Sequence, residues 1–206
     1  EYYKEQSHKF IKLLLEYTPE IEQVSIDECY MDFTSIKKKF NSPMEAAVII
    51  KDRIYKELGF TVNIGISDCK LLAKMASDFQ KPNKVHTLYR NEIQKKMWPL
   101  PIEELLMVGK SSAKTLRNLG IKTIGELAGT PQDIIISNMK SHGKMIWEYA
   151  NGIDDSKVET EQIANKGVGN STTMPEDTDN PEIISRVLMQ LSDSVAERLR
   201  KMDMKA

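Results

Sequence analysis

Two prolines, Pro99 and Pro101, separate two stretches of sequence with different hydrophobic patterns, and this change limits the folds that the chain can adopt. Before the prolines, helix-like and strand-like segments alternate in the order helix, strand, helix, strand, helix. After them, residues 102–150 are helical only. The pattern predicts an α+β or α/β region, in which helices cover a sheet, followed by an all-helical region.

Five elements are expected in the first region from the spacing of apolar residues and from residues that start or stop helices. They are a helix over 3–17, a strand over 23–33, a helix from Ser42 to Gly59, a strand over 60–66 and a helix over 68–79. The Ser42 side chain is expected to cap its helix, Pro43 to lie in the first turn and Glu45 to complete a capping box. Gly59 is expected to end that helix.

Fewer strand patterns occur in the rest of the chain. Residues 102–150 are expected to form short helices broken at four glycines: Gly109, Gly120, Gly129 and Gly143. Residues 151–168 are polar and lack periodicity, so they are expected to form a linker. A short strand over 170–174 and a helix from Pro181 to Met202 are expected last, and the apolar face of that helix has no evident partner.

Composition favours a soluble, cytoplasmic protein. No stretch approaches the roughly 18 consecutive apolar residues that a membrane helix needs. The opening EYYKEQSHKF is polar, unlike a signal peptide. Cys29 and Cys69 are not part of a metal-spaced cluster, and reduced thiols are favoured over a disulfide.

The formal net charge of −1 conceals an uneven distribution. The net charge is −3 over residues 1–50, +7 over 51–122 and −5 over 123–206. A basic middle segment is typical of contact with a polyanion, although lysines solvated on helix surfaces give the same count.

The adjacent acids Asp27 and Glu28 stand out because strand interiors are poor in carboxylates. Mg²⁺ prefers hard oxygen ligands and is often held by one or two carboxylates together with substrate phosphates. The alternative is a solvated strand end. Because adjacent residues of an ideal strand point to opposite faces, both acids reach one metal only at a strand end or a bulge.

Three lysines, Lys70, Lys74 and Lys81, surround the helix that follows the second strand. A lysine beside a helix end can meet a phosphate as a point charge. The alternative is an amphipathic helix with an ordinary polar face.

Residues 100–128 have the form of a helix-hairpin-helix, with a hairpin at Val108, Gly109 and Lys110. Glycine lets the hairpin backbone approach a phosphate closely, and the N–H groups at the next helix start favour an anion. Lys110, Lys114 and Arg117 add positive charge nearby. We expect contact with nucleic acid that does not depend on base sequence, the alternative being a helical hairpin that only packs.

Three motifs occur in this order: SIDECYMD at 25–32, GISDCKLLAKMASDFQKPN at 65–83 and the helix-hairpin-helix at 100–128. Together they resemble the Y-family (translesion) DNA polymerases over essentially the whole chain. The bacterial DNA polymerase IV and UmuC-like members of the ImpB/MucB/SamB family are the most similar. The resemblance implies an α+β fold with the later part of a palm over 1–99, a thumb over 100–155, a linker over 156–167 and the first part of a little finger over 168–206.

The resemblance also implies roles for individual residues. Asp27 and Glu28 match the family's catalytic carboxylates and would ligate Mg²⁺, two ions being expected in the full-length enzyme. Lys81 matches the lysine that contacts the incoming deoxynucleoside triphosphate. Four residues match the thumb hairpin and helix that bind the duplex backbone: Val108, Gly109, Lys110 and Lys114.

This sequence departs from the family pattern at several places. The family's other metal-binding Asp and its fingers lie upstream of the matched region. Cys69 stands where Asn is common, Lys84 where Gly is common, and Met107 where many relatives have the first hairpin Gly. The chain is therefore expected to be a fragment that does not polymerise by itself.

The resemblance implies as partners primer–template DNA and a deoxynucleotide, with a sliding clamp reached through a more C-terminal segment and no membrane. It implies a bacterial cytoplasmic, nucleoid-associated location. Two other classes remain open. One is a catalytically silent relative that binds DNA as an accessory protein. The other is a nuclease or glycosylase with a helix-hairpin-helix, which leaves the motifs at 25–32 and 81–83 unexplained.

Overall fold

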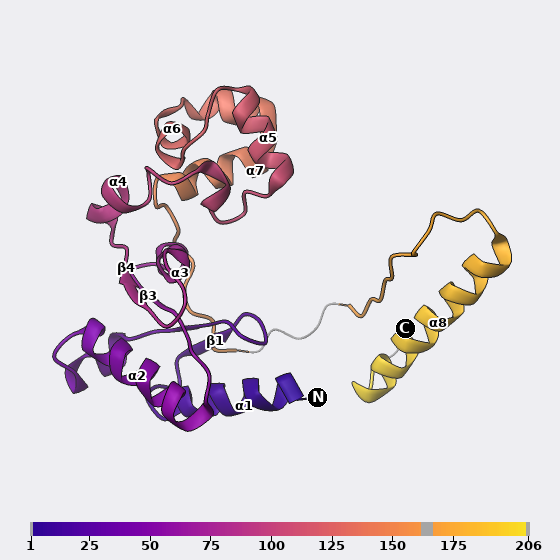
Figure 1. The fold of residues 1–206 in the computed structure, drawn as a ribbon, viewed down its shortest axis with the longest axis horizontal. Coiled ribbons are helices and arrows are strands. Elements are labelled where there is room, and N and C mark those ends of the chain that lie inside the picture. Colours follow the sequence, from indigo (N-terminus) through magenta and orange to yellow (C-terminus); the bar gives the residue numbers. More distant parts are fainter. Residues whose placement is uncertain (1, 162–166, 205–206) are drawn as a thin grey trace. The chain divides into compact units, whose positions relative to one another are not determined.

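The computed structural model describes residues 2–161 and 167–204, which fall into two compact units, 1–161 and 162–206 (Figure 1). The first unit begins with α1 (Tyr2–Leu15), β1 (Ile21–Gln23), β2 (Cys29–Met31), the 3₁₀ helix η1 (Thr34–Lys39), α2 (Pro43–Leu58), β3 (Ile64–Ile66), α3 (Lys70–Asp78) and β4 (Val85–Thr87). It continues with η2 (Arg90–Glu92), α4 (Ile93–Lys96), η3 (Ile102–Glu104), α5 (Lys110–Asn118), α6 (Ile124–Gly129) and α7 (Gln132–Ala150). The second unit contains α8 (Pro181–Lys201). The expected α+β class is confirmed.

The single strand expected over 23–33 is wrong, because this segment forms a hairpin. β1 and β2 pair antiparallel, with Ile21 opposite Met31 and Gln23 opposite Cys29. The backbone N–H groups of Val24 and Ser25 both donate to the carbonyl of Glu28, at 3.0 and 3.2 Å, and close the loop. The apolar alternation continues through this loop, which is why the pattern did not indicate a turn.

β3 and β4 are parallel neighbours joined by α3, so that residues 64–87 form a β-α-β unit. β4 was not expected from the sequence. Gly65 permits a close approach between β3 and α3, since a Cβ there would lie 1.8 Å from the carbonyl oxygen of Ala73. The helix that carries Lys70 and Lys74 is therefore fixed against the strand that precedes it.

α2 begins and ends as expected, except for one capping contact. The Ser42 hydroxyl accepts a hydrogen bond from the Glu45 N–H at 3.1 Å, and Gly59 takes a left-handed conformation with φ 78°. The Glu45 carboxylate reaches back to the N–H of Asn41, at 2.7 Å, rather than to Ser42. The expected capping box is thus only half formed.

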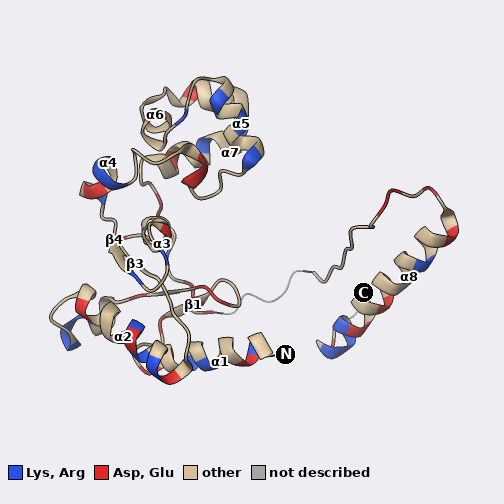
Figure 2. Ribbon diagram, in the orientation of Figure 1, with Lys and Arg blue, Asp and Glu red and all other residues tan. Residues whose placement is uncertain are grey.

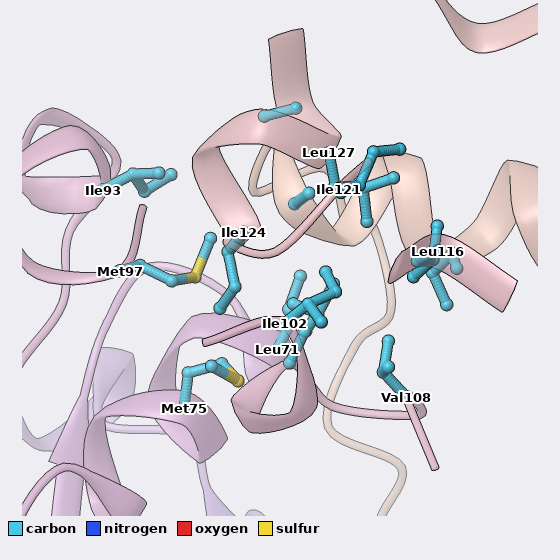
Figure 3. Close-up of a cluster of buried hydrophobic side chains, with 14 of the residues drawn as sticks. Leu71, Met75, Ile93, Met97, Ile102, Val108, Leu116, Ile121, Ile124 and Leu127 are labelled. Carbon is cyan, nitrogen blue, oxygen red and sulfur yellow. The ribbon is translucent and has the colours of Figure 1, made fainter. Parts of the chain in front are cut away.

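The helical region packs on α3 through one continuous core. Figure 3 shows Leu71 and Met75 of α3 beside Ile102 and Ile124, all of them buried. Breaks at Gly109, Gly120 and Gly129 are confirmed, because each of these glycines lies at a helix boundary. The break expected at Gly143 is wrong: Gly143 is buried inside α7, and the irregular backbone falls at Lys140, with φ 55°.

Within residues 167–204, the second unit holds a single helix, and all the residues of that helix retain solvent contact. The helix expected from Pro181 to Met202 is confirmed as α8, which Asn180 caps by accepting from the N–H of Glu182 at 2.9 Å. The strand expected over 170–174 is wrong, since these residues are irregular. Part of the expected linker, 162–166, lies outside the described residues. In the described parts of both units, no helix is long and apolar enough to cross a membrane.

Candidate metal and nucleotide site

Asp27 and Glu28 lie at the tip of the β1–β2 hairpin, immediately before β2. The Ser25 hydroxyl donates to Asp27 Oδ1 at 2.7 Å and accepts from the Glu28 N–H at 3.1 Å. Both acids are exposed and both precede the first paired residue of the strand. They therefore stand at a strand end, the position in which two adjacent carboxylates can face one ligand.

The Glu28 carboxylate begins a chain of ion pairs that runs along α3. Glu28 Oε1 lies 2.6 Å from Lys74 Nζ, which also lies 3.2 Å from Asp78 Oδ2. The other oxygen of Asp78, Oδ1, lies 2.7 Å from Lys81 Nζ. Four side chains from the hairpin, from α3 and from the loop after it thus form one line of alternating charge.

These contacts shift the pKa values of the two central groups. Partial burial lowers the pKa of Lys74, but its hydrogen bonds to Glu28 and Asp78 outweigh burial and raise it above the ordinary value. Partial burial raises the pKa of Asp78, but hydrogen bonds from Lys81 and Lys74 outweigh it and lower the pKa. Both groups are therefore charged near neutral pH.

One cleft of about 1550 Å³ contains this line of charge. Its lining includes Asp27, Glu28, Lys74, Asp78 and Lys81. The structure therefore brings together the two carboxylates and the lysine that the sequence singled out. Asp78 was missed, although its spacing of four residues from Lys74 on one helical face could have indicated their contact.

No group of three or more His, Cys, Asp or Glu side chains suited to a metal ion occurs within 2–161 and 167–204. Asp27 and Glu28 are nonetheless hard oxygen donors beside a cleft, and Mg²⁺ sites commonly use one or two carboxylates together with substrate phosphates and water. The residues present thus fit a partial Mg²⁺ site that substrate oxygens would complete.

Lys70 has a different environment from Lys74 and Lys81. Its Nζ lies 2.6 Å from Glu22 Oε2 in a largely buried ion pair, and 5.0 Å from the centre of the Tyr30 ring. Lys70 also donates to the carbonyl of Lys157 at 3.1 Å, and the N–H of Glu159 donates to Glu22 at 2.8 Å. Lys70 thus joins the hairpin to the segment after α7 rather than facing the cleft with a free charge.

The hairpin before α5 is the second candidate site. Val108 is buried, while Gly109, Lys110 and Lys114 are exposed. A Cβ on Gly109 would meet no atom within 4 Å, so no packing inside the chain requires glycine there. Figure 2 shows basic residues along α5. An exposed glycine before a lysine-bearing helix leaves backbone N–H groups open to an anion.

Met107, the residue before this hairpin, has an unfavourable backbone conformation. Its φ is 71°, and its side chain is 56% exposed. The hairpin is held from within, because the N–H of Val108 donates to the carbonyl of Leu105 at 3.0 Å. The Met therefore occupies a backbone conformation that favours glycine, next to a hairpin residue that keeps this hydrogen bond.

Three family models match the chain. The impB/mucB/samB family matches residues 1–78, the IMS family HHH motif matches 90–121, and the impB/mucB/samB family C-terminal domain matches 165–206. Among curated relatives, DNA polymerase IV of Clostridium acetobutylicum is 50% identical over 198 residues, which is 96% of this chain and 50% of the relative. DNA polymerase IV 1 of Halalkalibacterium halodurans is 43% identical, over 97% of this chain and 48% of the relative.

The chain is also similar to solved structures. A Y-family DNA polymerase chimera aligns over 95% of this chain and 57% of its own, with 26% identity and a TM-score of 0.77. DinB from Sulfolobus solfataricus aligns over 95% of this chain and 57% of its own, with 25% identity and a TM-score of 0.69. The chain spans about half the length of the curated relatives that it matches.

Proposed function

The chain belongs to the impB/mucB/samB family of Y-family DNA polymerases, and we propose from this membership that it works as part of a DNA-directed DNA polymerase that tolerates template lesions. The longer protein adds a deoxynucleotide to a primer 3′-end opposite a template. The 3′-hydroxyl oxygen forms a bond to the α-phosphorus while the bond to pyrophosphate breaks. Residues 1–99 act as palm, 100–155 as thumb, 156–167 as linker and 168–206 as the start of a little finger.

The observation that carries the proposal is the meeting of Asp27 and Glu28 with Lys81 in one cleft. Phosphoryl transfer needs little covalent help from the protein and depends on positioning and on compensation of negative charge. Carboxylates and an ammonium group in the same cleft supply complementary positions for metal ions and for a triphosphate. This combination suits a ligand that carries both, such as a metal-bound nucleotide.

Asp27 and Glu28 are the residues that would hold Mg²⁺, with two ions in the complete enzyme. When bound, Mg²⁺ supplies a Lewis acid that lowers the charge on the reacting phosphate and favours the ionised form of the primer hydroxyl. The Ser25 hydroxyl, at 2.7 Å from Asp27, orients that carboxylate. Lys81, at the other end of the line of ion pairs that begins at Glu28, binds the triphosphate as a point charge.

The thumb hairpin binds the backbone of duplex DNA. Val108 anchors the hairpin in the core, and Gly109 exposes the first N–H groups of α5 to a phosphate. Lys110 and Lys114 add charge on the exposed side of that helix. These contacts fix the position of the duplex without reading base sequence. Primer–template DNA and a deoxynucleotide are the substrates in this proposal. A sliding clamp is a further partner. The location is the bacterial cytoplasm, at the nucleoid.

The test is single-nucleotide primer extension with Mg²⁺ by the longer protein, compared with Asp27→Asn in that protein. We expect extension by the unmodified protein and its loss in the variant, whereas Asp52→Asn, at an exposed position of α2, should extend normally. No extension by the unmodified protein, with duplex binding intact, would favour the catalytically silent DNA-binding relative. Extension that persists in Asp27→Asn would refute the assignment of that carboxylate.

The chain as given is expected not to extend a primer, because two carboxylates make only part of a metal site. Primer extension by residues 1–206 alone would contradict this. Duplex binding by the chain is a separate measurement. Its affinity should fall steeply with salt, since the proposed contacts are to phosphates, and a flat dependence between low and moderate salt would count against the thumb assignment.

A further inference from the structure

Ion pairs join four side chains in the order Glu28, Lys74, Asp78 and Lys81, and we call this line the relay. Its ends are Glu28 and Lys81, and its central residues are Lys74 and Asp78. The proposed function uses the ends: Glu28 to hold a metal and Lys81 to contact a triphosphate. It gives no role to Lys74 and Asp78, which connect them. The two central residues therefore connect functional side chains without having a function of their own in that proposal.

Lys74 pairs with the carboxylate that would also hold a metal ion. Its Nζ lies 2.6 Å from Glu28 Oε1, as close as a strong charge-assisted hydrogen bond permits. A divalent cation bound to the same carboxylate would repel the ammonium at that distance. Metal ligation by Glu28 thus weakens this ion pair and favours movement of Lys74 away from Glu28.

Asp78 offers Lys74 a second acceptor one helical turn away. Asp78 Oδ2 already lies 3.2 Å from Lys74 Nζ, so a small change of rotamer closes that contact. Asp78 Oδ1 meanwhile lies 2.7 Å from Lys81 Nζ. If Lys74 moves fully to Asp78, one carboxylate must neutralise two ammonium groups, and its hold on Lys81 weakens.

We propose that Lys74 is the counter-ion of Glu28 in the metal-free site, that a divalent metal displaces it onto Asp78, and that this displacement releases Lys81 toward a phosphate. Lys74 and Asp78 are positioning residues in this scheme, because they act through Glu28 and Lys81. The inference rests on the proposed function for the roles of the two ends. It adds an order of events in which metal binding prepares the phosphate contact.

The exposure of the relay is consistent with this exchange. The side chains of Glu28 and Asp78 are 48% and 39% exposed, and that of Lys81 is 58% exposed. Ion pairs between groups of this exposure contribute little and re-form readily. Lys74, at 21% exposed, is the most enclosed member and has both acceptors within reach.

The first experiment titrates residues 1–206 with Mn²⁺ and follows the paramagnetic broadening of the amide signals of residues 25–30. Lys74→Met should tighten Mn²⁺ binding by about three- to tenfold, because it removes the competing ammonium. Lys84→Met, which removes an exposed charge outside the relay, is the matched control and should change affinity less than about twofold. Equal affinities of Lys74→Met and the unmodified chain would overturn the proposal, as would no broadening in either.

Asp78→Asn separates the relay from general electrostatics. In the unmodified background it should weaken Mn²⁺ binding by about threefold, because Lys74 then has only Glu28 as acceptor. In the Lys74→Met background the same substitution should have almost no effect. A simple loss of negative charge near the metal would instead weaken binding equally in both backgrounds, and that additive result would overturn the proposal.

The release of Lys81 has its own readout. With a limiting amount of acylating reagent, the extent of acylation at Lys81 is measured by mass spectrometry. It should rise by about twofold with saturating Mn²⁺ in the unmodified chain and stay constant in Lys74→Met. An extent of Lys81 acylation that does not change with Mn²⁺ in the unmodified chain would overturn this step.

Asp27→Asn distinguishes failure of the proposed metal site from failure of the relay. Broadening at residues 25–30 that persists in this variant would show that the proposed metal assignment is wrong. Broadening that disappears in Asp27→Asn but is unaffected by Lys74→Met would leave the metal site standing and remove the relay alone.

Discussion

Asp154 Oδ2 accepts a hydrogen bond of 2.9 Å from the backbone N–H of Leu71, so a residue that follows α7 caps the start of α3. The residue at the helix start itself, Cys69, makes no capping hydrogen bond with its side chain. The first free N–H groups of a helix need such a partner when they are not solvated. The helix that carries Lys74 is thus positioned by the chain returning from the helical region.

Asp154→Ala should lower the free energy of unfolding by about 1 kcal/mol, as expected for the loss of a helix cap. The measurement is urea denaturation of residues 1–206, followed by the fluorescence of Trp98 and Trp147, which both lie in the first unit. Asp155→Ala is the control, because this neighbouring carboxylate is exposed. Equal stability of the two variants would show that the capping bond contributes nothing.

The cap also predicts a pH dependence. Partial burial raises the pKa of Asp154, but hydrogen bonds from Ser156 and from the Leu71 N–H outweigh it, and the pKa lies below the ordinary 3.8. A carboxyl with a lowered pKa stabilises the fold above its unfolded pKa and loses that contribution as pH falls through the folded pKa. The stability difference between the unmodified chain and Asp154→Asn should therefore shrink from about pH 5 to pH 3. A difference that is constant over this range would contradict the capping role.

The sequence indicated which side chains lie together better than it indicated the backbone that carries them. Adjacent acids and a lysine-bearing helix were visible as residue types at given spacings, and the structure gathers them in one cleft. The turn between β1 and β2 was not visible, because Val24 and Ile26 continue an apolar alternation while standing 55% and 46% exposed. An alternating apolar pattern predicts a strand correctly only where its apolar side chains are buried.

Contacts between residues that are not neighbours in the sequence account for the other differences. Gly143 resembles a helix breaker in the sequence, but it lies inside α7, where a Cβ would approach the carbonyl oxygen of Ile135 to 2.7 Å. The role of Asp154 depends on a partner from another element, because its bond to the N–H of Leu71 spans 83 positions. Such a pair has no local signal.

Gly65→Ala should destabilise the first unit more than the other substitutions considered so far. A Cβ at this position would lie 1.8 Å from the Ala73 carbonyl oxygen and 2.6 Å from the Ser77 nitrogen, both of them backbone atoms of α3. Relief requires β3 and α3 to separate, and overpacking of this kind costs about 1–3 kcal/mol or more. Urea denaturation checks this. Gly129→Ala, where a Cβ meets nothing within 4 Å, is the matched substitution and should be close to neutral.

Met107→Gly should raise the free energy of unfolding by up to about 1 kcal/mol. A non-glycine residue at φ 71° is disfavoured by roughly 1–2 kcal/mol, and the greater freedom of glycine in the unfolded chain offsets part of that relief. Met107→Ala keeps the unfavourable backbone and should leave stability nearly unchanged, because the Met side chain is mostly exposed. Equal gains from both substitutions would place the effect in the side chain, and the strain explanation would then be wrong.

Gly109→Ala should weaken binding to duplex DNA without weakening the fold. Gly109 has φ −83° and open space around a Cβ, so alanine should change the free energy of unfolding by less than about 0.5 kcal/mol. The added methyl group would stand where a phosphate must approach the first N–H groups of α5, and the loss of one charge-assisted hydrogen bond corresponds to roughly tenfold in affinity. Fluorescence anisotropy with a labelled primer–template duplex at low salt measures the change.

Two further variants complete this test. Gly129→Ala should bind normally. Lys110→Ala should weaken binding, with a salt slope smaller by about 1. Unchanged binding by Gly109→Ala, in a chain of unchanged stability, would show that the hairpin backbone does not contact DNA.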